Sequence, residues 1–68
     1  MMALRLNGQW VEAADLDDAQ RLLCTARDES GVGSEEWYSH GRTQGQVRAS
    51  GKVIATISYN GRVWPVAA

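Results

Sequence analysis

The sequence predicts a small α+β domain with an antiparallel sheet of about five short strands, in the chain order β-β-α-β-β-β, and one amphipathic helix packed on one face. Three observations predict it. Apolar and polar residues alternate near both ends of the chain, Asn-Gly pairs that favour hairpin turns interrupt this alternation, and apolar residues at helical spacing lie between. Short connections favour antiparallel neighbours. A chain of 68 residues has room for one domain, 1–68.

The first predicted element is a hairpin. Apolar side chains alternate with others along residues 2–6, which is the pattern of a strand with one buried face. The Asn-Gly pair that follows favours a two-residue type I′ turn. That turn places Leu4 opposite Val11 on one face of the hairpin and Arg5 opposite Trp10 on the other.

A helix follows at roughly Leu16 to Glu29. Asp15 is suited to accept a hydrogen bond at the helix start, and Gly31 is suited to the left-handed conformation that ends many helices. Apolar residues at helical spacing form one stripe along this segment: Leu16, Ala19, Leu22, Leu23 and Ala26. We expect this stripe to pack on the sheet.

Residues 31–42 are rich in glycine, serine and charge, and we interpret them as a surface loop that carries Trp37 and Tyr38. Two alternatives stay open. Ser34 would cap a single helical turn, or Glu36 to Tyr38 would begin an edge strand.

Two further hairpins are predicted to close the chain. A three-residue loop at 49–51 would set Val47 opposite Val53, and a two-residue loop at 60–61 would set Ile57 opposite Trp64. The core face would then hold Val53, Ala55, Ile57, Trp64 and Val66. Pro65 cannot donate a ladder hydrogen bond, so the last strand is predicted to lie at a sheet edge. Whether Trp37 and Trp64 lie in the core or at the surface stays open.

The residues that would carry catalysis are few. His40 is the one histidine and Cys24 the one cysteine, and neither has neighbours in the sequence that form a recognisable triad or ligand set. We therefore expect no enzymatic activity, no cofactor and no metal. A lone cysteine in so short a chain, with no apolar run of signal-peptide or membrane-spanning length, favours a cytoplasmic protein without membrane attachment.

The net charge of −1 conceals an uneven distribution. All eight acidic residues lie between Glu12 and Glu36, whereas four basic residues and no acidic one follow Trp37. The aromatic and arginine side chains of the second half are of the types that dominate binding hot spots and that also stack on nucleic-acid bases. The predicted partner-binding residues are Trp37, Tyr38, Arg42, Arg48, Tyr59 and Arg62.

Two segments resemble known families. The opening from Leu4 to Glu12, followed by a capped helix, resembles the start of small β-grasp sulfur carriers, although the chain ends in 64-WPVAA-68 and lacks the C-terminal Gly-Gly that these proteins need. The segment from Gly51 to Trp64 resembles the hairpin end of small uncharacterised proteins of phages and mobile elements, and is loosely similar to small anti-CRISPR proteins. The second resemblance implies a non-catalytic inhibitor that docks on a larger host complex.

The leading hypothesis is accordingly a non-enzymatic protein-binding module, encoded by a phage or mobile element, whose partner is another protein or protein complex. One alternative is weak nucleic-acid binding by a basic, aromatic sheet surface. Another is a β-grasp-like protein without sulfur-carrier activity. A homodimer formed through an edge strand also stays open.

Overall fold

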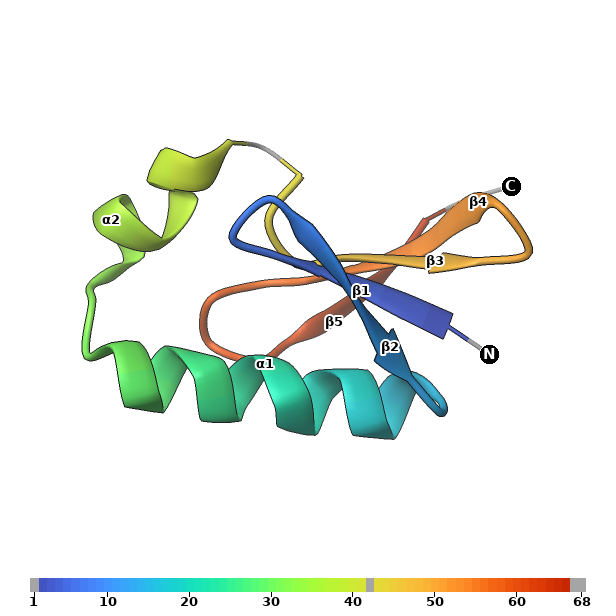
Figure 1. Cartoon of the computed structure of the whole chain (residues 1–68), viewed down its shortest axis with the longest axis horizontal. Helices are drawn as coiled ribbons and strands as arrows, with labels where there is room; N and C mark the ends of the chain where they lie inside the picture. The colour runs from blue at the N-terminus through green and yellow to red at the C-terminus, as the bar shows by residue number, and fades with distance from the viewer. Residues whose placement is uncertain (1, 42, 67–68) are drawn as a thin grey trace.

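Five antiparallel strands form one sheet in the order β2-β1-β3-β4-β5, and helix α1 lies along one of its faces (Figure 1). The computed structural model describes residues 2–41 and 43–66. Its elements are β1 (Met2–Leu6), β2 (Gln9–Ala13), α1 (Leu16–Ser30), α2 (Ser34–Trp37), the 3₁₀ helix η1 (Tyr38–His40), β3 (Gln46–Ala49), β4 (Lys52–Ile57) and β5 (Val63–Pro65). The predicted α+β fold is confirmed.

The β1–β2 hairpin has the predicted register. Leu4 lies opposite Val11, and Arg5 lies opposite Trp10. The turn residues before β2 have φ values of 52° and 81°, the positive values that a type I′ turn requires and that Asn and Gly tolerate.

Helix α1 begins and ends at the predicted caps. The Asp15 carboxylate accepts a hydrogen bond from the Asp18 N–H (2.8 Å), and Gly31 closes the helix with φ 66°. Asp18 in turn accepts from the Ala14 N–H (2.9 Å). This bond, followed by the contact with Arg21, lowers the pKa of the Asp18 carboxyl. Within the described chain, no helix is long and apolar enough to cross a bilayer.

The β3–β4 hairpin differs from the prediction. Its loop has two residues, Ser50 and Gly51, with φ values of 52° and 78°, and a bulge follows in the ladder. Val47 therefore lies opposite Ala55 and not Val53. The side chain of Val53 is 37% exposed, so its assignment to the core was wrong.

The loop of the β4–β5 hairpin is longer than predicted, whereas that of the β3–β4 hairpin is shorter. The Ser58 N–H donates to the Arg62 carbonyl (2.9 Å), and the Gly61 N–H donates to the Ser58 carbonyl (2.8 Å), so the loop has three residues and not two. The extra residue shifts the register by one, which turns each side chain of β5 to the other face. Trp64 thus lies opposite Thr56 instead of Ile57.

This shift removes two residues from the predicted core. Trp64 is 53% exposed and Val66 is 48% exposed. The prediction that Pro65 marks a sheet edge is confirmed, because β5 is the last strand of the sheet.

The buried core lies between α1 and the sheet. It consists of Leu4, Ala13, Ala19, Leu23, Trp37, Val47, Ala55 and Ile57. The interpretation of residues 31–42 as a loop was wrong, because α2 and η1 form there, and Trp37, whose burial was left open, sits at the end of α2 and is 2% exposed. Of the two alternatives, the helical turn is the one that forms, although Gly33 and not Ser34 is its cap residue.

Gly45 joins three strands. Its N–H donates to the Arg5 carbonyl of β1, and its carbonyl accepts from the Ile57 N–H of β4, both at 2.8 Å. Its φ is 85°, and a Cβ at this position would lie 2.2 Å from the Ile57 carbonyl oxygen. The close approach of these backbones requires glycine at this position.

Candidate binding surface

The sheet face opposite α1 carries one row of side chains that crosses all five strands. The observed register places Trp10 opposite Arg5, and Thr56 opposite both Gln46 and Trp64. Leu4 of β1 pairs with Val47 of β3, and Arg5 and Gln46 are the next residues in the two strands. Strand alternation therefore puts Arg5 and Gln46 on the same face. An indole therefore stands at each end of this row.

Two arginine side chains flank the indole of Trp10. The guanidinium carbon of Arg48 lies 4.1 Å from the ring centroid, and that of Arg5 lies 5.2 Å from it. These distances are within the range of cation–π attraction. Arg48 reaches the ring from β3, where it lies opposite Ala3. The contact thus ties β3 and β1 to β2 and concentrates two positive charges at one place.

Part of the Arg5 guanidinium is removed from water. Its Nε is buried and has no hydrogen-bond partner among the described residues. A guanidinium carries five N–H donors, so the remaining donors of Arg5 are the ones through which it can contact an acceptor.

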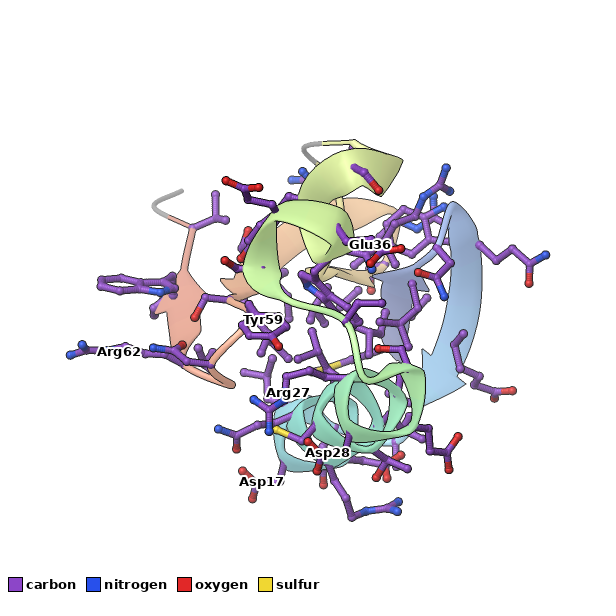
Figure 2. The ribbon with its side chains drawn as sticks, turned by 90° about the vertical axis from the view of Figure 1, so that its left-hand side faces the viewer. Asp17, Arg27, Asp28, Glu36, Tyr59 and Arg62 are labelled. Carbon is purple, nitrogen blue, oxygen red and sulfur yellow. The ribbon has the colours of Figure 1, made fainter. Side chains whose placement is uncertain are left out.

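A second arginine–indole pair lies at the other end of the row. The guanidinium carbon of Arg62 is 4.8 Å from the centroid of the Trp64 ring. Figure 2 shows Arg62 extending away from the body of the protein beside β5. We call Arg5, Trp10, Arg48, Arg62 and Trp64 together the cationic face.

Most of the acidic residues lie on the helices. Seven of the eight acidic residues belong to α1, its cap or α2: Asp15, Asp17, Asp18, Asp28, Glu29, Glu35 and Glu36. Figure 2 shows Asp17 and Asp28 on the helix, well separated from Arg62. The remaining acidic residue, Glu12, lies in β2 opposite Ala3, at the rim of the cationic face. The acidic residues of α1 and its cap therefore lie on the helix side of the sheet, whereas Figure 2 shows Glu36 on α2, away from α1.

The three predicted aromatic site residues come together, but away from this face. The rings of Trp37 and Tyr59 meet edge to face, with centroids 5.9 Å apart. The Tyr38 hydroxyl accepts a hydrogen bond from the Tyr59 N–H (3.0 Å). These contacts join α2 and η1 to the β4–β5 loop.

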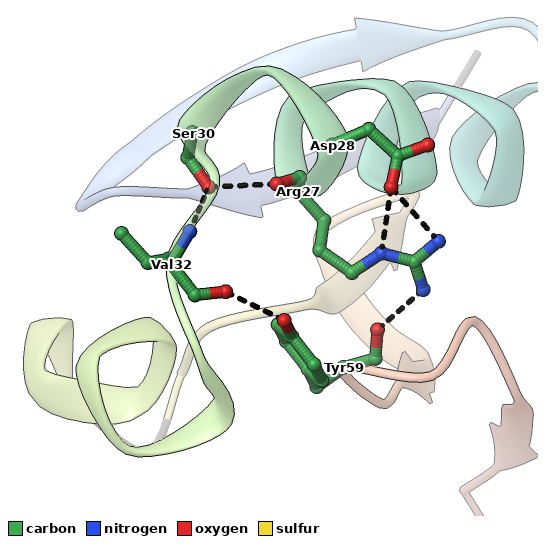
Figure 3. A network of polar contacts seen from close by, with 5 residues as sticks. All are labelled: Arg27, Asp28, Ser30, Val32 and Tyr59. Carbon is green, nitrogen blue, oxygen red and sulfur yellow. Dashed lines mark hydrogen bonds and ion pairs between the residues drawn. The ribbon is translucent and has the colours of Figure 1, made fainter.

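A polar network fixes the same loop to the end of α1 (Figure 3). The Tyr59 hydroxyl donates to the Val32 carbonyl (2.5 Å), and Arg27 donates to the Tyr59 carbonyl (2.8 Å). Arg27 also lies beside the Asp28 carboxylate, at 3.3 Å. Both the hydroxyl and the backbone carbonyl of Tyr59 are therefore hydrogen-bonded. These bonds connect the β4–β5 loop to the end of α1.

The predicted site is thus divided by the structure. Arg48 and Arg62 lie on the cationic face, and Arg42 lies outside the described residues. Sequence reasoning omitted Arg5, Trp10 and Trp64 from the site. The predicted register of the first hairpin could have indicated Arg5 and Trp10 as site residues, because it placed them opposite each other.

No protein-family model, curated protein sequence or solved structure matches this chain. The resemblances to β-grasp carriers and to anti-CRISPR proteins consequently stay predictions. Among the side chains that the structure describes, no three from His, Cys, Asp and Glu gather at a spacing that suits a metal ion.

Proposed function

We propose that this chain is a non-enzymatic protein-binding module that docks through its cationic face on an acidic surface of a larger protein or protein complex. The observation that carries the proposal is the placement of two guanidinium groups against the indole of Trp10 on the sheet face that α1 leaves uncovered. A phage-encoded inhibitor is the form of this function that the resemblance to anti-CRISPR proteins implies, and the lone cysteine favours a cytoplasmic location.

The stacked geometry suits recognition of carboxylates. An arginine held flat against an aromatic ring loses less side-chain freedom on binding than a free one, and its planar fork still presents paired N–H donors. Arginine and tryptophan are also the residue types most enriched where binding energy concentrates. Arg48 and Trp10, at 4.1 Å, are therefore expected to dominate the interface.

Charge reversal on each side of the molecule tests this proposal. Poly-L-glutamate serves as a defined acidic polypeptide, and its binding is followed by tryptophan fluorescence at low salt. We expect Arg48→Glu to weaken binding at least about tenfold, as loss of a 1.4 kcal/mol contact would. The matched control is Arg21→Glu on α1, whose side chain is 69% exposed and lies on the acidic side of the protein. Equal binding by the two variants would remove the cationic face as the docking surface.

Nucleic-acid binding by the same face is a second candidate, favoured by the exposed indole of Trp64. Bases stack on open aromatic rings, and each stacked base contributes about 1–3 kcal/mol. The ring of Trp10, however, is already flanked by two guanidinium groups, which favours the protein partner. Titration with a labelled single-stranded oligonucleotide separates the two: binding that Trp64→Ala abolishes, without binding to poly-L-glutamate, would replace the first proposal by the second.

A further inference from the structure

The outer edge of β2 has backbone groups that no strand of the described chain covers. β2 is the first strand of the sheet order, and Figure 2 shows no helix or strand beyond it. The other edge is β5, which has three residues and includes Pro65, a residue without an N–H. Of the two edges, β2 is therefore the one suited to pair with another strand.

The hydrogen bonds of β1 determine which groups of β2 point outward. The Arg5 carbonyl accepts from Gly45 on the β3 side, so Arg5 and Trp10 form a pair without hydrogen bonds to each other. The N–H and carbonyl of Trp10 consequently point away from β1. By the two-residue repeat of a strand, those of Glu12 do so too. The backbone groups of β2 that are free to bond another strand are thus those of Trp10 and Glu12, on either side of Val11.

We propose that β2 pairs with β2 of a second copy of this chain, antiparallel and symmetric about Val11, to form a homodimer with one continuous sheet. In this register Trp10 lies opposite Glu12 of the second copy, and the two exchange backbone hydrogen bonds. Val11, which is half-buried in the single chain, would meet its own copy on the inner face.

Charge complementarity favours a second copy of this chain as the strand that pairs with β2. A charged residue on an edge strand commonly prevents pairing with a like strand. Here symmetry does not bring Glu12 against Glu12, because it faces Trp10, over which the Arg48 guanidinium lies at 4.1 Å. Each Glu12 carboxylate would therefore lie beside the Arg48 guanidinium of the other copy, and the contact occurs twice in the dimer.

The dimer goes beyond the proposed docking function, because it would join two cationic faces side by side. Trp10, Arg5 and Arg48 lie at the β2 end of the row, next to the symmetry axis.

Sedimentation equilibrium of the full chain, from micromolar to millimolar concentration, tests the dimer. We expect the mean mass to rise from 7.5 kDa toward twice that value. A monomer at every concentration would overturn the proposal. Loss of the dimer with retained binding to poly-L-glutamate would leave the docking function intact, so the two proposals can fail separately.

A charge swap tests the register. Glu12 is exposed, so Glu12→Lys should leave the fold intact by circular dichroism while raising the dimer dissociation constant at least about tenfold. Adding Arg48→Glu restores opposite charges across the axis and should recover most of the dimer. The control is Glu29→Lys, an equal charge change at the far end of α1. A Glu12→Lys variant that dimerises like the Glu29→Lys control would refute the pairing, as would a double variant without recovery.

Discussion

At the scale of single residues, Trp37 has the largest side chain in the core and is 2% exposed. It comes from a helical turn of four residues, an element too short to be stable in isolation. Its ring packs against Tyr59, whose hydroxyl and backbone are in turn held by Val32 and Arg27. The indole therefore stabilises α2 by tertiary contact and not by helix propensity.

Replacement of this residue should be costly. We expect Trp37→Ala to lower the free energy of unfolding by about 3–5 kcal/mol, a large part of the stability of so small a domain. Trp64→Ala is the matched control, because Trp64 is 53% exposed, and should change it by within about 0.5 kcal/mol. Urea denaturation followed by circular dichroism measures both. Similar losses in the two variants would contradict the assignment of Trp37 to the core.

At the scale of the elements, the loop lengths of the two C-terminal hairpins are the reverse of those predicted. The loop after β3 has two residues where three were predicted, and the loop after β4 has three where two were predicted. Each contains a glycine with positive φ, which both loop types accept, so local turn chemistry left the choice open. In the second loop the Asn60 side chain accepts from the Arg62 N–H (3.2 Å), a bond that favours the longer form.

Gly45 offers a test at this scale, since it connects β1, β3 and β4. Gly45→Ala combines an unfavourable positive φ with a Cβ placed 2.2 Å from a carbonyl oxygen, whereas Gly51→Ala has the positive φ and open space. We expect Gly51→Ala to cost about 1–2 kcal/mol and Gly45→Ala substantially more. Gly33→Ala, at φ −81° and in open space, tests neither feature and should cost less than about 1 kcal/mol, through the N-cap of α2 alone. Chemical denaturation of the three variants compares these costs, and equal costs at positions 45 and 51 would refute the close strand contact.

At the scale of the whole molecule, charge is divided between two sides. Five of the eight acidic residues lie on α1 or its cap, and three arginines lie on the sheet face opposite α1. The ion pairs found among the described residues, Arg21–Asp18 and Arg27–Asp28, each have an exposed partner. Salt bridges of this kind contribute about 0–1 kcal/mol to stability. The charge pattern therefore bears on association more than on folding.

Ionic strength should accordingly separate binding from stability. Raising salt from 20 mM to 500 mM shortens the Debye length several-fold, so binding to poly-L-glutamate should weaken by at least about tenfold. The free energy of unfolding should change by less than about 1 kcal/mol. Fluorescence titration and urea denaturation in the same buffers measure the two quantities. Binding that does not respond to salt would contradict an electrostatic interface.

The sequence by itself determined the elements that depend on neighbouring residues. Periodicity and caps located α1, and Asn7-Gly8 with its flanking alternation determined the first hairpin and the contact of Arg5 with Trp10. Both depend on hydrogen bonds and steric preferences within a few residues.

Only the tertiary structure decided which tryptophan is buried and which residues share the cationic face. A single residue of loop length reverses the face of a strand, and this moved Trp64 to the surface. The buried tryptophan is Trp37, which reaches the core from a segment with no strong local signal. Whether a side chain is buried depends on all its contacts with distant segments, and these contacts cannot be deduced from the spacing of residues along the chain.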